Sequence, residues 1–235
     1  MTILSTNELR NRIFNEDLVD RKKLYITPIL DLEKQIKDTS ASIDLRLGTE
    51  FIILRRTESS HIDPFGFEEN LELEAIKAQF KNYQSRIHVN FGGKLVLHPH
   101  QYIIGVTFEY LRFPLDLSAY VIGRSSWGRL GLIVAMATVI HPGYTGVLTL
   151  ELENFGEVPI TLYPGARICQ LVFHEVKENE DIQYEDIYCK TKYIAGTVPA
   201  FSKIYEDAER EKLKIFYNKI EQENKLKLQT GKSVV

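Results

Sequence analysis

The sequence predicts a mainly β fold, built as an all-β barrel or sandwich, with a short N-terminal helix and an amphipathic C-terminal helix. Three observations support this prediction. Short apolar runs recur from residue 42 onward, turn residues separate them roughly every 8–12 positions, and no long helical segments lie between them. A doubly wound α/β sheet needs helices between its strands, so the pattern favours a barrel or a sandwich.

The N-terminal segment is typical of a short helix followed by an extended edge. Ser5 and Glu8 have the spacing of a capping box, in which each side chain satisfies an unpaired backbone N–H at the start of the helix. Residues 24–30 then form an extended segment that Pro28 interrupts, because proline lacks a backbone donor.

The predicted strands follow one another from residue 41 to residue 176. Residues 58–82 interrupt them with an acidic, irregular stretch in which 71–80 has the composition for one or two helical turns. Together with the N-terminal helix, the strands define a predicted domain over residues 1–202. The predicted strand runs are 41–48, 50–56, 94–99, 102–114, 118–126, 132–140, 146–156, 159–165 and 167–176.

The chain changes character after Ser202. Residues 203–228 contain no glycine or proline and are rich in helix formers, with acidic residues first and lysines last, as the helix dipole favours. We therefore predict a helical extension over residues 203–235. Its apolar face packs either on the β domain or on another copy or partner. This face consists of Leu213, Phe216, Tyr217 and Ile220, spaced i, i+3, i+4, i+7.

Composition narrows the class of protein. The 235 residues carry a formal net charge of −3, which argues against a nucleic-acid partner, since proteins that bind polyanions usually carry a basic excess. No apolar stretch reaches about 18 residues, and the first residues lack the apolar core of a secretory signal. The two cysteines form no CxxC pair, which argues against a zinc site. We expect a cytoplasmic protein without a membrane association.

The densest polar cluster in an apolar region is the segment 123–129, Gly-Arg-Ser-Ser-Trp-Gly-Arg. Glycine lets backbone N–H groups approach an anion, serine hydroxyls add donors, and guanidinium groups make bidentate contacts with phosphate. Taken alone, the cluster is weak evidence for an anion site, and a strand followed by a turn with surface arginines is the simpler interpretation.

Two acidic residues and one histidine add further candidates. Glu151 and Glu153 alternate along one predicted strand and therefore share a face. A carboxylate in so apolar a strand is costly unless it is paired or functional. His141 brings a titratable group into the tight turn 141–146, whose simpler interpretation is an ordinary hairpin.

These motifs resemble the dCTP deaminase family, which groups with the trimeric dUTPases. The resemblance covers about residues 1–203 and leaves the C-terminal helix outside it. Its most specific strings are Gly123-Arg124-Ser125-Ser126-x-x-Arg129-Leu130-Gly131-Leu132, Pro142-Gly143-x-x-Gly146 and Thr149-Leu150-Glu151.

The resemblance implies a distorted β-barrel that assembles as a homotrimer with active sites at the subunit interfaces. It also implies zinc-independent removal of the 4-amino group of dCTP, which gives dUTP and ammonia, with Mg²⁺ carried by the triphosphate. Glu151 matches the catalytic glutamate, and Arg129 and Ser125 match its supporting residues. The positions that match nucleotide-binding residues are Arg124, Ser126, His141, Thr149, Leu150, Tyr184 and Lys192, the last two in a C-terminal lid.

Three departures from the family pattern bear on specificity. His141 replaces an aspartate that lies near the sugar 3′-hydroxyl in the deaminases and activates water in the dUTPases, which argues against a dUMP-forming enzyme. The segment between Arg129 and Pro142 is one residue shorter than in most deaminases, which affects the base site. The lid lacks a glutamine near Gly196.

Two alternative functions remain open at the level of sequence. One is a catalytically weak nucleotide-binding paralogue, which acts as a sensor or partner module and binds dCTP or dTTP; His141, Gly196 and the added helix motivate it. The other is a dUTP diphosphatase, against which Glu151 and Arg129 argue, because dUTPases lack these residues at the matching positions.

Overall fold

The computed structural model describes residues 2–38, 40–58, 60–67, 71–135, 139–177, 193 and 195–229. The chain divides into two compact units. The first, here called the β unit, consists of Met1–Leu54 and Ser85–Ala200. The second, here called the helical unit, consists of Arg55–Gln84 and Phe201–Val235. It thus combines the predicted C-terminal extension with a segment that the sequence analysis placed in the β domain.

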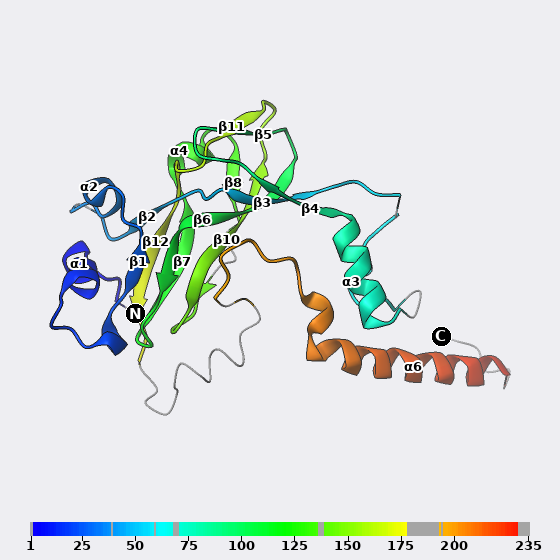
Figure 1. Ribbon diagram of the computed structural model, residues 1–235. Helices are drawn as coiled ribbons and strands as arrows, with labels where there is room; N and C mark the ends of the chain where they lie inside the picture. Colours follow the sequence, from blue (N-terminus) through cyan, green and yellow to red (C-terminus); the bar gives the residue numbers. More distant parts are fainter. Residues whose placement is uncertain are drawn as a thin grey trace. The chain divides into compact units, whose positions relative to one another are not determined.

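The β unit confirms the mainly β prediction (Figure 1). Its strands form a six-stranded sheet of β4-β3-β6-β10-β8 with β1 also on β6, a four-stranded sheet of β2-β12-β7-β9, and the pair β11-β5. The described strands are β1 (Tyr25–Thr27), β2 (Ile43–Arg46), β3 (Glu50–Leu54), β4 (Gln84–His88), β5 (Leu95–Leu97), β6 (Tyr102–Arg112), β7 (Leu117–Gly123), β8 (Leu132–Val134), β9 (Val139–Ile140), β10 (Thr145–Asn154), β11 (Ile160–Leu162) and β12 (Arg167–Glu175).

The described strands do not close into a barrel. The edge strands of the two large sheets, β4 and β8 in one and β2 and β9 in the other, do not pair across the sheets. One apolar core serves both sheets instead, and the stacked rings of Phe113 and Phe173, 5.4 Å apart, join them inside it. The predicted distorted barrel is therefore realised as packed open sheets, because a shared core requires facing apolar surfaces and not closure.

Two differences from the predicted strands concern the edges of the sheets. Residues 132–140, expected as one strand, form β8 on β10 and β9 on β7, in different sheets. The strand β4 was not predicted, because Gln84–His88 contains few apolar residues and is only partly covered. Strands that lie at an edge need less apolar character, so composition detects them poorly.

Buried and more exposed side chains alternate along much of β10, so this strand presents one face to the core and the other away from it. Leu148, Leu150 and Leu152 are buried, whereas the residues between them point to the opposite face. β10 pairs along most of its length with β6, from Thr145 opposite Arg112 to Glu153 opposite Tyr102.

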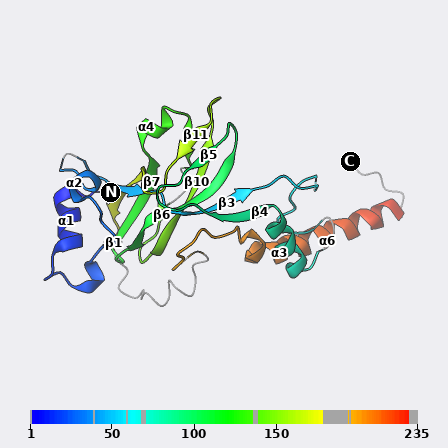
Figure 2. The ribbon, with the colours of Figure 1, turned by 45° about the horizontal axis from the view of Figure 1, so that its top comes forward.

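The short helices of the β unit flank the sheets at two places. Figures 1 and 2 show α1 and α2 at one edge, beside β1 and β2, whereas α4 lies at the end near β5 and β11. These elements are α1 (Thr6–Phe14), the 3-10 turn η1 (Asp20–Lys22), α2 (Leu32–Gln35) and α4 (Ser125–Gly128).

The predicted N-terminal helix and its cap are confirmed. The Ser5 hydroxyl accepts a hydrogen bond from the N–H of Glu8 at 3.3 Å. The Glu8 carboxylate pairs with Arg12 at 3.1 Å instead of returning to the start of the helix. Arg12 also forms a buried ion pair with Asp116 at 2.9 Å, which fastens α1 to the β unit.

The helical unit contains α3 (Leu73–Asn82), the 3-10 turn η2 (Ile204–Glu206) and α6 (Ala208–Gln229), with a small core of its own. Phe80 packs edge-on against Tyr83 and Tyr205. Arg210 is nearly buried and donates to the carbonyl groups of Phe65 at 3.0 Å and Leu71 at 3.1 Å. The core and these bonds tie α3, its preceding loop and the start of α6 together.

The predicted C-terminal helix is present, and the apolar face assigned to it is not enclosed in the single chain. Phe216 and Tyr217 are each more than half exposed. In the part of the chain that the structure describes, no helix is both long enough and apolar enough to cross a bilayer.

Candidate functional site

The predicted polar cluster forms the turn that follows β7. Arg124 is the N-terminal cap of α4, and Arg129 is its C-terminal cap. The turn begins against a neighbouring strand, because the N–H of Arg124 donates to the carbonyl of Ile168 on β12 at 3.3 Å. The exposed side chains of this turn are those of Ser125, Ser126 and Arg129.

Arg124 is held from behind by two residues of other strands. Its Nε lies 3.4 Å from Oδ2 of Asp44 on β2, and its Nη1 donates to the carbonyl of Arg167 on β12 at 3.2 Å. The same carbonyl accepts from Nε1 of Trp127 at 2.8 Å. The turn is therefore fixed at both Arg124 and Trp127, which packs against the core.

The two candidate carboxylates share one face of β10, as their spacing predicts. Glu151 is exposed and Glu153 half-buried, and their neighbours on β6 are Ile104 and Tyr102. Burial, together with the charges of Glu151 and Glu153, raises the pKa of Tyr102 to about 12. This face thus has a negative local potential next to a neutral phenol.

Glu151 and Arg129 lie at different ends of β8 within one chain. β8 runs antiparallel to the end of β10, with Leu132 opposite Asn154, and the N–H of Ala135 donates to the carbonyl of Glu151 at 2.8 Å. Arg129 precedes β8 and thus lies toward the Asn154 end. Among the residues that the structure describes, neither Arg129 nor Glu151 forms an ion pair.

The middle of β10 presents backbone groups on its side away from β6. The N–H of Val147 donates to the carbonyl of Gly196 at 2.9 Å, and the carbonyl of Glu151 accepts from Ala135. Thr149 lies halfway between these two pairings, and strand geometry turns its N–H and C=O to the same side. Leu150 next to it is buried. A planar group with donors and acceptors would find a matching edge at Thr149.

His141 lies on the exposed turn between β9 and β10. The turn is tight, because Gly143 adopts a left-handed conformation with φ of 75° and its N–H donates to the carbonyl of Pro114 at 3.2 Å. Tyr144 packs against the core, and its hydroxyl donates to the carbonyl of Val147 at 2.7 Å. Burial raises the pKa of Tyr144 far above its usual range.

The candidate residues thus fall on three segments of the β unit: the α4 turn, the middle of β10 and the turn that precedes β10. Tyr184 and Lys192, predicted in the lid, lie outside the described residues. The chain that follows them meets the start of β10, where the N–H of Ala195 donates to the carbonyl of Thr145 at 2.6 Å.

Sequence reasoning missed the residues that support the α4 turn. Asp44 lies in the predicted strand 41–48, and Arg167 opens the predicted strand 167–176, yet no spacing relates either to Arg124. The available signal was an aspartate between two apolar residues, Ile43 and Leu45, of a predicted strand, because a carboxylate that becomes buried needs a partner.

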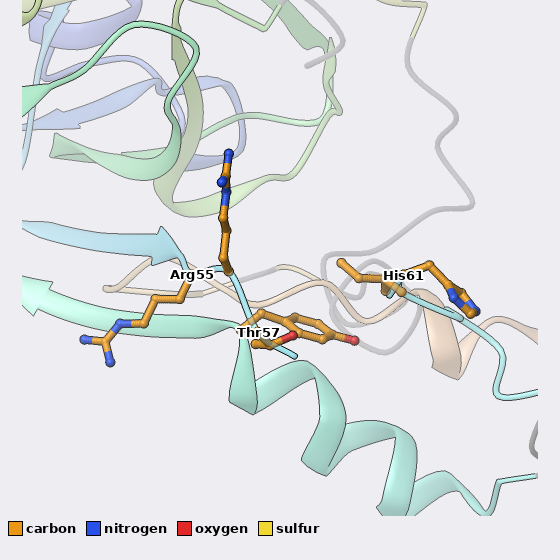
Figure 3. A pocket seen from close by; sticks show the side chains of 6 residues that line it. Arg55, Thr57 and His61 are labelled. Atoms are coloured by element: carbon orange, nitrogen blue, oxygen red, sulfur yellow. The ribbon is translucent and has the colours of Figure 1, made fainter. Parts of the chain in front are cut away.

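A surface cavity of about 330 Å³ lies in the helical unit (Figure 3). Arg55 and Thr57 line one side and His61 the other, with Tyr83 in the wall. None of its residues belongs to the predicted site. Across the described residues, no group of three or more His, Cys, Asp or Glu side chains is arranged to hold a metal ion.

Comparisons with known proteins decide the family. The model of a family described as dCTP deaminase-like matches residues 3–176, which includes the α4 turn and β10. The chain belongs to the dCTP deaminase-like family. The α6 helix lies outside the matched residues.

Relatives within the family are similar over most of their length. A dUMP-forming dCTP deaminase from Methanosphaera stadtmanae is 36% identical over 208 residues, which cover 88% of this chain and 96% of the relative. A dCTP deaminase from Natronomonas pharaonis is 39% identical over 208 residues, or 88% and 97% of the two chains. The crystal structure of the dCTP deaminase from Agrobacterium tumefaciens superposes with a TM-score of 0.50 at 27% identity, over 73% of this chain and 48% of that one.

Proposed function

We propose that this protein is a homotrimeric dCTP deaminase that hydrolyses dCTP to dUTP and ammonia. The observation that carries the proposal is that Glu151 and Arg129 are both exposed and unpaired among the described residues. Both lie on elements of the matched family region. Two such groups are suited to meet across an interface between copies of the chain, where each supplies what the other lacks.

The reaction needs one group that moves protons. In the proposed mechanism, Glu151 accepts a proton from water as the water oxygen attacks C4 of the cytosine ring. The carboxyl group then delivers this proton to N3, takes the remaining proton of the added hydroxyl, and passes it to the amine, which leaves as ammonia. Such a positioned acid–base group contributes about 10²–10⁴ in rate.

Arg129 and Ser125 support this transfer. The Arg129 guanidinium from one copy would hold the Glu151 carboxylate of the next in a fixed orientation through a charge-assisted hydrogen bond. The exposed hydroxyl of Ser125, on the same side of α4, would orient the water or the amino group.

Nucleotide binding would use the other predicted residues. Arg124 and Ser126 would bind the triphosphate, which brings Mg²⁺ with it as part of the substrate. The backbone at Thr149 and Leu150 would read the base edge, and His141 would lie near the sugar. The geometry that supports this is the backbone of Thr149, which faces away from β6 between two hydrogen-bonded neighbours. Tyr184 and Lys192 remain predicted contacts of the lid.

Exposed apolar side chains around the same elements support an interface between copies. Leu130, after α4, is 61% exposed, and Phe155, at the end of β10, is 65% exposed. Ile133 on the edge strand β8 is also exposed. Apolar side chains that cluster at a sheet edge favour association with another chain.

The relatives leave the product open, because dUMP-forming and other dCTP deaminases are similarly related to this chain. His141 favours dUTP as the product. A histidine keeps a hydrogen-bonding group but lacks the permanent negative charge that would activate water for attack on the phosphate chain.

The proposal is tested by incubating the purified protein with dCTP and Mg²⁺ and separating the nucleotides by chromatography, with ammonia and pyrophosphate measured in parallel. We expect dUTP and ammonia in equal amounts and no pyrophosphate. Pyrophosphate release from dUTP would indicate a diphosphatase. Failure to convert any cytosine nucleotide would contradict deamination, and tight dCTP or dTTP binding without turnover would support a binding paralogue.

A further inference from the structure

Asp44 is a buried carboxylate that pairs with two arginines, one of which, Arg124, belongs to the proposed nucleotide site. Its side chain is 9% exposed, and one oxygen, Oδ2, lies 2.8 Å from Nη1 of Arg167 and 3.4 Å from Nε of Arg124. Two guanidinium groups therefore share one carboxylate oxygen. Because both arginines are only about a quarter exposed, water cannot replace this neutralisation fully.

Arg167 and the start of β12 also hold Arg124 in place. A bulge between Arg167 and Cys169 interrupts the pairing of β12 with β2. Such a bulge redirects local side chains and backbone groups. Here the Arg167 side chain reaches Asp44 and the carbonyl of Lys34, at 2.9 Å, while the Arg167 carbonyl accepts from both Arg124 and Trp127.

Asp44 is itself held in place through α2. Nε2 of Gln35 donates to the carbonyl of Asp44 at 3.3 Å and to Oε1 of the fully buried Glu109 at 2.9 Å. Burial raises the pKa of Glu109, and Arg46 opposes this rise with a backbone hydrogen bond and an ion pair. The position of Asp44 is thus fixed from the core outward, before any ligand binds.

The arrangement uses only part of the hydrogen-bonding capacity of Arg124. A guanidinium group has five N–H donors. The Nε–H faces Asp44 and one Nη1 donor binds the Arg167 carbonyl, so the Nη2 amino group keeps its donors for a ligand. An arginine fixed at its inner edge loses less conformational entropy when it binds an anion.

We propose that Asp44 is a positioning residue that holds Arg124 in the orientation needed to bind the phosphate groups of the substrate. The inference rests on the proposed function, because it assigns Arg124 to the triphosphate. It adds that recognition of the phosphate groups is controlled by an aspartate that touches no substrate and that belongs to a different strand.

The test compares substrates with and without the outer phosphate groups. The kcat/KM values for dCTP and dCMP are measured for the wild type and for Asp44→Asn, which preserves shape and removes the charge. We expect kcat/KM for dCTP, divided by kcat/KM for dCMP, to fall about tenfold in Asp44→Asn. The change should lie in the KM for dCTP and not in kcat, because the charge-assisted contact between Arg124 and the phosphate groups of the bound substrate is weakened. If Asp44 had only a structural role, Asp44→Asn would lower kcat/KM equally for dCTP and dCMP. The ratio of the two values would then stay unchanged.

A double-mutant cycle shows whether Asp44 acts through Arg124. In the Arg124→Gln background, Asp44→Asn should change the ratio no further. The matched control is Asp116→Asn, which removes the charge of another largely buried carboxylate paired with an arginine, Arg12, outside the proposed site. This control should lower the melting temperature and leave the ratio unchanged.

The outcomes separate the two proposals. Wild-type deamination with an unchanged ratio in Asp44→Asn overturns the inference alone, whereas a wild type that neither converts nor binds dCTP overturns both. If the wild type binds without turnover, the same ratio is taken from dissociation constants. If Asp44→Asn does not fold, Asp44→Glu replaces it: the displaced carboxylate should lower the ratio in the same direction, and an unchanged ratio overturns the inference.

Discussion

Arg124 and Arg129 lie at the two ends of one short helix and have opposite environments. Arg124 is anchored to Asp44 and to the backbone of β12, and its side chain is about one-quarter exposed. Arg129 is exposed, and no described residue pairs with it. One chain therefore fixes by itself the arginine that is proposed to bind the phosphate groups. The part that positions the proton-transfer group stays open for another copy.

The difference between Arg124 and Arg129 predicts that substitutions at the two residues affect stability and activity differently. A residue that is already paired inside the chain contributes to folding and to function together. A residue that finds its partner only in the assembled site contributes to function, and its loss leaves the monomer fold unchanged. The following predictions test this division.

The largest effect is expected at Glu151, the proposed proton-transfer group. Glu151→Gln keeps the shape of the side chain but cannot accept a proton from water, so kcat should fall by about 10²–10⁴. The side chain is exposed on β10, so circular dichroism and the melting temperature should remain those of the wild type. Turnover of dCTP within tenfold of the wild type would exclude Glu151 as the proton-transfer group.

Arg129→Gln should lower kcat by about 10²-fold, because a misplaced general base loses most of its rate contribution. Its melting temperature should match the wild type within about 1 °C, since Arg129 is exposed within its own chain and a single ion pair between copies contributes little to stability. Steady-state kinetics and thermal unfolding on one preparation measure both. A drop in stability without a loss of rate would reverse the assignment of this residue.

Arg124→Gln should combine a moderate loss of function with a loss of stability. We expect KM for dCTP to rise about tenfold and the melting temperature to fall by about 2–4 °C, because the substitution leaves Asp44 and the Arg167 carbonyl with fewer partners. Lysine at this position restores the charge but not the planar fork, so Arg124→Lys should recover only part of either loss.

The smallest effect is expected for an exposed ion pair far from this helix in the sequence. The pKa of His88 is raised above its usual value by hydrogen bonds to Glu50 and Asn90. A raised folded-state pKa stabilises the protein below the unfolded value of about 6.5, and this stabilisation disappears as pH rises through the raised pKa. His88→Gln should therefore lower the melting temperature at pH 6 by about 1 °C or less and leave it unchanged at pH 9.

Much of the fold follows from local sequence pattern. Alternation fixes the strands that bury one face, such as β10, and Ser5 with Glu8 marks the first helix. The weakly apolar edge strand β4 and the separation of β8 from β9 depend on which strands meet in three dimensions. The grouping of residues 55–84 with the C-terminal helix depends on Arg210 and a small aromatic core, which no short-range pattern encodes.

The candidate site was predictable to a different extent. Motifs identify Glu151, Arg129 and the α4 turn, because chemistry restricts the residue types in each. The contact between Asp44 on β2 and Arg124 at the start of α4 joins residues that are 80 positions apart, so only the tertiary structure brings them together. Arg129 and Glu151 do not pair within the described part of one chain. Their proposed contact between copies is therefore tested on the oligomer.

The most direct test of this assembly mixes two inactive variants. Glu151→Gln and Arg129→Gln are co-expressed with different affinity tags, and trimers that contain both are purified through the two tags in succession. If each site takes Glu151 from one copy and Arg129 from the next, one of the three sites is intact in every trimer that contains both variants. We predict that dCTP deamination returns to a corresponding share of the wild-type rate. Mixed trimers no more active than either variant alone would contradict a site shared between copies.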